Sequence, residues 1–469
     1  MNIVYNYIME IVENKNEKIA KLVFAGGAGT VTGANYLFEI DGKKILVDCG
    51  LTQGVKLADD LNWDPFPYDP KEIDILFVTH AHIDHVGRIP KLMNEGFKGV
   101  IYSTHPTRSL ALPMMEDTAM ILSKNIDFGL DKIYDLENIK NSLKLWKGYN
   151  YYEKFKISDD VEVSFLNAGH ILGSAMIKFT YNGKNILFTG DLGNSPSPIL
   201  PDTDKITDID YMIMESVYGD RNHELRDERR KFLEAAIEDN YKRKGTLLIP
   251  TFSLERSQEL LFELNELVEN KRIPIMPIFF DSPLAIKLTE IFKQYKDYFN
   301  DEAKRVMIHD KYIFDFPGLK TTLKSDESKS ISEAPNPKII IAGSGMSSGG
   351  RIVHHERHFL PDPNNTLLLT GYQSAGTPGR MIQEGVKTVR ISHEYVEVRS
   401  HIVTISGYSG HKDSDGLVEF VSNSADTLKK VFVVMGEPKS SLFLVQKLKD
   451  NLGIDAYAPE QGESIIIRC

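Results

Sequence analysis

The sequence predicts an α/β protein in which one domain is interrupted by a second, inserted α/β domain. Three observations lead to this prediction. Before Leu192, apolar strand-like stretches end in histidine and aspartate residues of the kind that bind metal ions. From about Tyr211 to Thr370, strand-like and helix-like stretches alternate regularly, which is typical of a mostly parallel sheet. Past about Thr388 the chain returns to short strand-like stretches.

The first expected strands bring a carboxylate to a sheet edge. These strands are predicted at 21–24, 35–40 and 44–47. The glycine-rich turn 26–33 after the first of them lacks the spacing of a phosphate-binding loop, so it is read as tight turns. Asp41-Gly42 is a hairpin signal between the other two strands. The last strand leads directly into Asp48.

The densest group of ligand-type residues is the run Thr79-His80-Ala81-His82-Ile83-Asp84-His85, which follows the apolar stretch 73–78. Side chains alternate along an extended chain, so His80 and His82 can grip one cation. Asp84 and His85, just before a helix expected from Val86 onward, can face a second cation. Imidazole nitrogen with carboxylate oxygen is the ligand set of zinc and its neighbours. The alternative is a surface turn that is histidine-rich by chance, which is rare for a chain with 13 histidines.

Two further ligand candidates stand at the ends of later strands. A helix at 89–96, a strand at 100–103 and a helix-rich stretch at 107–154 are expected first. The strand 161–166 then leads to His170, which glycines flank, and the strand 185–189 leads to Asp191. A lone histidine at a strand end is more often structural than a ligand, whereas a carboxylate there can bridge two metal ions.

The inserted domain is predicted as a parallel sheet whose ligands lie at the carboxyl ends of its strands. Strands are expected at 211–214, 245–250, 277–280, 338–342 and 366–370. Helices are expected at 227–241, 255–269, 283–295 and 351–359. The polar stretch 324–337 predicts a surface loop. Short strands at 395–399, 402–406, 430–434 and 463–467 follow.

The glycine-rich loop 343–350 follows one of these strands and precedes a helix. Backbone N–H groups in such a loop, together with a helix N-terminus, can receive a phosphate group. The candidate phosphate- or RNA-binding residues are Ser344, Gly345, Ser347, Ser348 and Gly349. A plain strand-to-helix turn is the alternative.

The composition of the chain limits the classes of protein to which it can belong. A chain of 469 residues is long enough for two domains. Two cysteines, Cys49 and Cys469, make no disulfide framework, so a cytoplasmic location is expected. No apolar stretch approaches the ~20 residues of a membrane span, so no membrane partner is expected. The net charge of −11 weakens the case for a nucleic-acid substrate, although bound divalent cations can make a cleft positive.

The histidine run resembles the second motif of the metallo-β-lactamase superfamily. Four later stretches resemble the β-CASP branch of that superfamily, at 215–219 (ESVYG), 250–256 (PTFSLER), 281–285 (DSPLA) and 343–351 (GSGMSSGGR). The resemblance covers nearly the whole chain after about Ala20 and points to prokaryotic ribonucleases related to the cleavage-and-polyadenylation endonuclease subunit. It implies an αββα sandwich with an inserted β-CASP domain. The implied parts are an N-terminal appendage at 1–19, the sandwich at 20–208 and 389–469, and the insertion at 209–388.

The resemblance further implies a zinc-dependent ribonuclease of RNA processing or decay. A metal-bridged hydroxide would hydrolyse phosphodiester bonds of single-stranded RNA, with two Zn²⁺ per chain and Mn²⁺ or Fe²⁺ as alternatives. Family members that act on RNA tend to carry histidine at the position of His411, which favours RNA over DNA, and Glu215 would orient a proton donor. Asp48 would orient a ligand. The implied ligands are His80, His82 and His170 for one ion, Asp84, His85 and His411 for the other, and Asp191 between them.

Two positions depart from the family pattern. Met381 stands where a histidine proton donor is expected. His354 or His355 could take that role instead. The alternative, given equal weight, is that these histidines only pack or cap their helix. Met435 stands before Gly436-Glu437, where relatives commonly carry histidine, at a position expected to support the site rather than bind metal. These departures leave the proton donor open.

Other functions stay open beside the leading one. A hydrolase of a small molecule, such as a thioester or cyclic phosphodiester, would need the same metal residues but not the inserted domain. A non-catalytic RNA-binding subunit is disfavoured because every expected ligand is present. Within the ribonuclease prediction, endonucleolytic cleavage is favoured, 5′-to-3′ exonucleolytic cleavage is the alternative, and a homodimer is left open.

Overall fold

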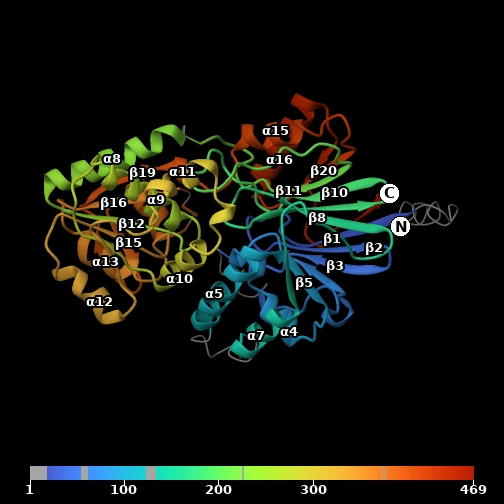
Figure 1. The fold of residues 1–469 in the computed structure, drawn as a ribbon, viewed down its shortest axis with the longest axis horizontal. Coiled ribbons are helices and arrows are strands. Elements are labelled where there is room, and N and C mark those ends of the chain that lie inside the picture. Colours follow the sequence, from blue (N-terminus) through green and yellow to red (C-terminus); the bar gives the residue numbers. More distant parts are fainter. Residues whose placement is uncertain (1–17, 54–61, 123–133, 224–225, 372, 375) are drawn as a thin grey trace.

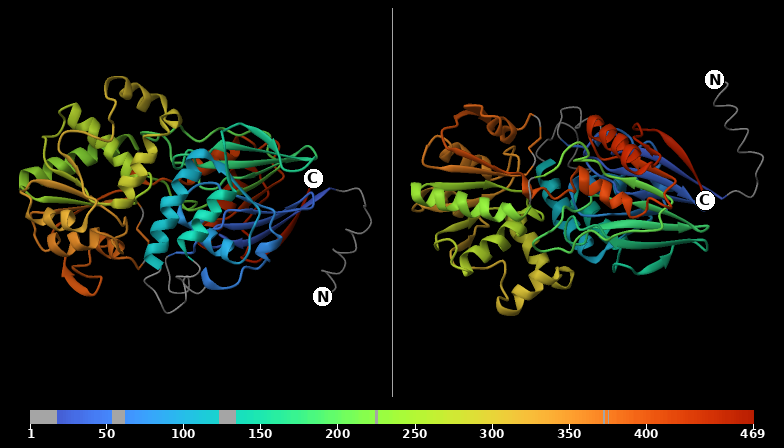
Figure 2. Two further views of the ribbon diagram at one scale, coloured as in Figure 1. Left: turned by 60° about the horizontal axis from the view of Figure 1, so that its bottom comes forward. Right: turned by 90° about the horizontal axis from the view of Figure 1, so that it is seen from above.

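The fold consists of a two-sheet sandwich with a separate lobe at one end of it, as Figure 1 shows. The computed structural model describes residues 18–53, 62–122, 134–223, 226–371, 373–374 and 376–469. The N-terminal appendage expected at 1–19 therefore lies outside the described residues, except for its last two positions. Figure 2 shows from two other sides that the carboxyl terminus lies at the end of the sandwich far from the lobe.

The sandwich consists of two seven-stranded sheets. The order of the first sheet is β22 (Ser464–Arg468), β1 (Ile19–Gly26), β2 (Asn35–Ile40), β3 (Lys43–Val47), β4 (Ile75–Phe77), β5 (Val100–Thr104) and β6 (Trp146–Tyr149). The order of the second sheet is β21 (Ala456–Tyr457), β20 (Lys430–Val433), β11 (Tyr211–Met214), β10 (Lys184–Phe188), β9 (Ala175–Tyr181), β8 (Val161–Asn167) and β7 (Lys154–Lys156).

A mostly aliphatic and aromatic core joins the two sheets. Phe38 of β2 contacts Phe179 of β9, with ring centroids 5.3 Å apart, and Phe188 of β10 at 5.5 Å. Edge-on aromatic pairs of this kind stabilise a core beyond the area that they bury. Helices cover the outer faces: α3 (Ile83–Val86), α4 (Ile89–Asn94), α5 (His105–Leu122) and α7 (Leu136–Leu145) on the first sheet, and α15 (Ser414–Ser422) and α16 (Pro438–Leu452) on the second. The αββα sandwich expected from the resemblance is confirmed.

The lobe contains a parallel six-stranded sheet. Its order is β14 (Leu319–Thr321), β13 (Ile278–Phe280), β15 (Lys338–Ala342), β12 (Thr246–Pro250), β16 (Thr366–Thr370) and β19 (His401–Ile405). Helices α8 (Arg226–Arg243), α9 (Arg256–Glu269) and α10 (Pro283–Phe292) pack on one face, and α13 (Ile352–Phe359) and α14 (Pro378–Gln383) on the other. The lobe also carries α11 (Asp301–His309), α12 (Ser325–Ser330) and the hairpin β17 (Thr388–Ile391) and β18 (Glu394–Glu397).

Two strands lie in a different sheet from the one expected. The strand predicted to open the inserted domain, β11, pairs in parallel with β10 and β20 of the sandwich. The strand β19, expected in the C-terminal part of the sandwich, pairs with β16 of the lobe. The sequence of a short apolar strand indicates that the strand is buried, but not which strand it pairs with, because strand pairing depends on long-range contacts. We propose that the inserted domain begins after β11 and ends with β19.

Two local expectations are wrong. Residues 146–149, expected in a helix-rich stretch, form β6, because Trp146 pairs with Ile101 and its Nε1 donates a hydrogen bond to Ser103 Oγ at 2.7 Å. The polar stretch expected as a loop contains α12, since the Glu327 carboxylate accepts hydrogen bonds from the backbone N–H groups of residues 323 and 324 and caps the helix.

The carboxyl ends of several strands point at the junction between sandwich and lobe. Asp48 follows β3, Thr79 lies two residues past β4, and Glu215 follows β11. From the lobe, Thr251 follows β12 and Gly343 follows β15. Parallel strands present their carboxyl ends at one edge, so both sheets direct their terminal side chains to the same region. No helix within the described ranges is long and apolar enough to span a membrane.

Candidate metal centre and interdomain cavity

Asp48 lies beneath the candidate metal ligands and contacts both Thr79 and His85. Its Oδ1 accepts a hydrogen bond from the backbone N–H of Thr79 at 2.8 Å, and its Oδ2 accepts one from Thr79 Oγ1 at 2.8 Å. Oδ2 also lies 2.7 Å from His85 Nδ1. When Nδ1 carries the proton and donates to Asp48, Nε2 of His85 keeps its lone pair for a cation. The geometry is that expected for a carboxylate that orients a ligand.

The first cluster consists of His80, His82, His170 and Asp191, whose ligand atoms lie within 4.8 Å of one another. His82 Nδ1 lies 3.1 Å from His80 Nε2 and 3.2 Å from His170 Nε2. Burial lowers the pKa of all three histidines well below the usual range, with neighbouring imidazoles adding to the effect. Neutral imidazoles with converging lone pairs are the form that binds a metal ion.

The second cluster consists of Asp84, His85 and Asp191. Asp191 reaches both clusters, because its Oδ2 lies 3.4 Å from His80 Nε2 while its Oδ1 lies 3.4 Å from His85 Nε2. Among the described residues, His85 Nε2 and Asp191 Oδ1 are buried without a hydrogen-bond partner. Two such atoms facing each other are suited to bind a cation between them, since burying polar atoms unpaired is costly. The residues present therefore suit a divalent metal ion.

The expected ligand His411 belongs to a third group of residues that could hold a metal ion. It joins Asp191 and Glu215 rather than Asp84 and His85. Its Nδ1 lies 3.2 Å from Glu215 Oε1 and 3.9 Å from Asp191 Oδ2. Burial by itself lowers the pKa of His411, but the facing carboxylates, Glu215 first, outweigh it and raise the pKa to about 9. His411 and Glu215 thus face each other beside Asp191, the residue that both clusters share.

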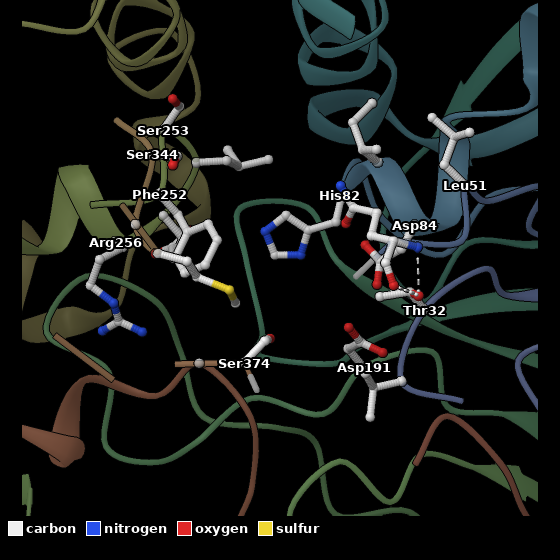
Figure 3. Close-up of a pocket in the computed structure, with 18 of the residues that line it drawn as sticks. Thr32, Leu51, His82, Asp84, Asp191, Phe252, Ser253, Arg256, Ser344 and Ser374 are labelled. Carbon is white, nitrogen blue, oxygen red and sulfur yellow. Dashed lines mark hydrogen bonds between the residues drawn. The ribbon is translucent and has the colours of Figure 1, made fainter. Parts of the chain in front are cut away.

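The clusters open into a cavity of about 590 Å³ between the sandwich and the lobe. His82, Asp84 and Asp191 point into it from the sandwich side, and Figure 3 shows Phe252, Ser253 and Ser344 on the opposite wall. His80 and His85 lie beneath this surface, both fully buried. His170 and His411 complete the wall that carries the two clusters.

Only part of the glycine-rich loop reaches the cavity. Ser344 and Gly345 line it. The Oγ of Ser344 accepts hydrogen bonds from the backbone N–H groups of Ser348 and Gly349, at 3.2 Å each. Ser347 is turned inward and donates to Glu356 Oε1 at 2.5 Å. Internal hydrogen bonds therefore occupy donors that were expected to face a phosphate, which leaves Ser344 and Gly345 as the cavity-facing candidates.

The two histidines considered as proton donors lie away from the cavity. Both are on α13, where His354 is exposed and His355 is buried. His355 Nε2 lies 2.7 Å from Asp281 Oδ2, in a buried network that also contains Arg351. Neither histidine lines the cavity. The packing role is the one that the geometry favours for His355.

The two methionines that depart from the family pattern have different surroundings. Met381 lies on α14, is 38% exposed and does not line the cavity. Part of the segment that identified it, at positions 372 and 375, lies outside the described residues. Met435 is buried and borders a small pocket with Asp48, His85 and Glu215. It therefore packs behind the second cluster.

The buried Glu356 beneath the glycine-rich loop predicts a pH effect on stability. Burial raises the pKa of Glu356 to about 8, above the usual 4.5, so the folded chain keeps a proton that the unfolded chain releases between these pH values. The free energy of unfolding should fall by up to about 5 kcal/mol as pH rises through this window. Thermal melts at pH 5 and pH 9 should show a smaller shift for Glu356→Gln. The exposed Glu269→Gln should behave as the wild type, and an unchanged slope in Glu356→Gln would contradict the prediction.

Comparison with known proteins agrees with this architecture. Residues 28–241 match the metallo-beta-lactamase superfamily, 257–382 the Beta-Casp domain, and 395–459 the Zn-dependent metallo-hydrolase RNA specificity domain. The chain is 36% identical over 446 residues to Ribonuclease TTHA0252 of Thermus thermophilus, covering 95% of this chain and 99% of that one. It is 33% identical to an RNase J-like protein of Methanocaldococcus jannaschii, covering 94% and 98%.

Two other matches are more distant. The chain is 31% identical to the transcription termination factor FttA of Methanosarcina mazei, covering 94% of this chain and 70% of that protein. A crystal structure of a protein of unknown function from Enterococcus faecalis superposes with a TM-score of 0.56 at 12% identity, covering 96% of this chain and all of that one. This last likeness concerns the fold alone.

The chain belongs to the metallo-β-lactamase superfamily, in the branch that carries an inserted Beta-Casp domain. The family resemblance seen in the sequence is thereby confirmed. The fold implies binding of a divalent metal ion, and the clusters around Asp191 offer the place for it. Sequence reasoning missed the wall opposite these clusters. The residue that could have indicated this wall is Phe252, an aromatic residue two positions after a buried strand in one of the family-like stretches.

Proposed function

We propose that this chain is a metal-dependent ribonuclease that hydrolyses phosphodiester bonds of single-stranded RNA in the interdomain cavity. The observation that carries the proposal is Asp191, which presents one oxygen to each of two ligand clusters at the cavity wall. The names of the relatives support it, because both the Thermus and the M. jannaschii proteins are called ribonucleases or RNase J-like. RNA processing or decay is the corresponding role, and a cytoplasmic location agrees with two free cysteines.

Two Zn²⁺ ions fit the clusters best. His80, His82, His170 and Asp191 would hold one ion, and Asp84, His85 and Asp191 the other. When bound, such a pair activates water at neutral pH and neutralises charge on the phosphate. The protein's own contribution is to hold the donors: Asp48 orients His85, and the carbonyl of Gly410 lies 3.1 Å from His170 Nδ1, so that Nε2 faces the cluster.

His411 is the proposed proton donor to the leaving oxygen. It lines the cavity, and its Nδ1 lies 3.2 Å from Glu215 Oε1. Glu215 is itself fixed by the backbone N–H of Leu192, which donates to Oε1 at 2.6 Å. A histidine whose one nitrogen is held by a buried carboxylate is oriented to exchange a proton through the other. This role is an alternative to the ligand role that the resemblance implied for His411, since Asp191, Glu215 and His411 together could also hold a metal ion.

The test is to count metal ions on the purified protein and to incubate it with matched 5′-labelled single-stranded RNA and DNA. Metal-dependent cutting of RNA, lost after chelation and in Asp84→Ala, is expected, and the fragment pattern separates internal from end-directed attack. The exposed Asp202→Ala is the matched control. Bound metal without cutting of either nucleic acid would overturn the proposal in favour of a small-molecule hydrolase. A chain without metal would overturn it altogether.

Asp48→Asn should weaken metal binding without unfolding the protein. The amide has nearly the shape of the carboxylate, but it lacks the charge and cannot accept from both Thr79 and His85 as the carboxylate does. Metal affinity, measured by competition with a fluorescent chelator, should fall by about 10- to 100-fold. Asp202→Asn serves as the control. An unchanged affinity would show that Asp48 does not orient the ligand.

A further inference from the structure

The cavity wall opposite the two ligand clusters carries an exposed aromatic ring. Phe252 is 41% exposed, although the neighbouring Leu254 is 3% exposed and belongs to the core. It stands in the turn after β12, and in Figure 3 its ring points into the cavity towards His82. The ring therefore offers a flat apolar face to a ligand in the cavity, opposite the polar clusters.

The Phe252 ring is held in place before any ligand binds. A Cβ atom placed on Gly345 would lie 2.8 Å from Phe252 Cδ2, which shows how closely the glycine-rich loop packs against the ring. The backbone is also fixed, because Ser257 Oγ donates to the Phe252 carbonyl at 2.7 Å and Thr251 N–H donates to Ala342 O at 3.0 Å. A pre-positioned ring loses little conformational entropy on binding.

Several hydroxyl groups lie close to the ring. Ser253, Ser344 and Ser374 line the same part of the cavity, and Figure 3 shows them around Phe252. The nearby Arg256 is 8% exposed and its Nη1 is paired with Glu259 Oε2 at 2.7 Å. Hydroxyl groups can accept or donate hydrogen bonds to a base edge, whereas a phosphate would call for a free cationic or backbone donor. The surroundings thus suit a nucleobase better than a second phosphate.

We propose that Phe252 is a stacking platform for one unpaired nucleobase of the RNA, next to the phosphate held at the metal clusters. This inference rests on the proposed ribonuclease function. A base stacked on Phe252 is withdrawn from pairing, so the site selects single-stranded RNA by shape and not by charge. Phe252 is accordingly a substrate-binding residue that sets which nucleotide lies beside the cleaved bond.

The test pairs variants of Phe252 with RNA that lacks one base at a time. Phe252→Leu keeps an apolar side chain but cannot stack, so it should raise KM for cleavage by about 10- to 100-fold with kcat little changed. An abasic nucleotide at one position of the RNA should raise KM of the wild type by the same factor, and it should not raise KM of Phe252→Leu any further. Phe252→Tyr should restore wild-type KM. Tyr395→Ala, an exposed aromatic residue on β18 outside the cavity, is the matched control.

The outcomes separate this inference from the function on which it rests. If the wild type cuts RNA but Phe252→Leu cuts intact RNA equally well, or both proteins lose the same factor on abasic RNA, the stacking platform is overturned and the ribonuclease stands. If the wild type cuts no RNA, the proposed function itself fails. RNA carrying a fluorescent base analogue gives a second readout: quenching on binding to the wild type, and none with Phe252→Leu at saturating protein, is expected. Equal quenching would overturn the platform.

Discussion

Replacing Asp191 with alanine is expected to abolish RNA cleavage and to lower the metal content of both clusters. Asp191 is 3% exposed, and its two oxygens lie 3.4 Å from His80 Nε2 and from His85 Nε2. Without it the histidines of the first cluster and His85 of the second lose the anion that they share. The cleavage rate should fall by more than about 10³-fold, because the groups that stabilise charge in the transition state are no longer held together.

The measurement combines metal analysis with single-turnover cleavage. Asp202→Ala is the matched control, since its side chain is exposed. A thermal melt of metal-free protein checks that Asp191→Ala is folded, so that lost activity is not lost structure. Full metal content in Asp191→Ala would contradict the bridging position. Retained metal at one ion per chain would show that the carboxylate serves only one cluster.

The second large effect is expected from His411→Ala, which should lower kcat by about 10²- to 10⁴-fold, the usual contribution of a positioned general acid. The loss should nearly vanish on a phosphodiester whose leaving group is a nitrophenolate, because such a leaving group departs without a proton. Glu215→Gln should show a smaller loss of the same kind, since Glu215 acts through His411 by their 3.2 Å contact. Metal content should be unchanged in both variants.

Two further variants test whether the effect is specific to His411. His309→Ala, an exposed histidine at the end of α11, is the matched control. His354→Ala tests one of the two histidines considered as donors from the sequence, and no loss is expected because His354 does not line the cavity. Loss of one metal ion per chain in His411→Ala, with no rescue by the better leaving group, would show that His411 is a ligand after all.

Individual strands and the histidine-rich candidate ligand run were predictable, because each is encoded by residues adjacent in the sequence. The strands β2, β15 and β16 span the predicted residues 35–40, 338–342 and 366–370, since each is a short run of largely apolar residues between turn signals. The histidine run predicted a metal cluster for the same reason: four ligand-type side chains follow one buried strand. The structure brings them together with His170 and Asp191.

The long-range partners depended on the fold. Glu215 and His411 are 196 residues apart, and they meet because β11 belongs to the sandwich while the chain crosses back from the lobe after β19. His355 could have faced the cavity by its place in the sequence, but it is buried against Asp281.

The sequence by itself determined the superfamily, the strand-ending candidate ligands and the existence of an inserted parallel sheet. The superfamily follows from the resemblance of the quoted motifs, whereas the candidate ligands and the inserted sheet follow from residue type and local period. Only the tertiary structure decided that β11 and β19 exchange the sheets expected for them, that His411 faces Glu215, and that Phe252 stands opposite the metal clusters. The physical reason is that local patterns specify which side chains are buried, whereas the pairing of distant strands decides which buried and exposed groups meet.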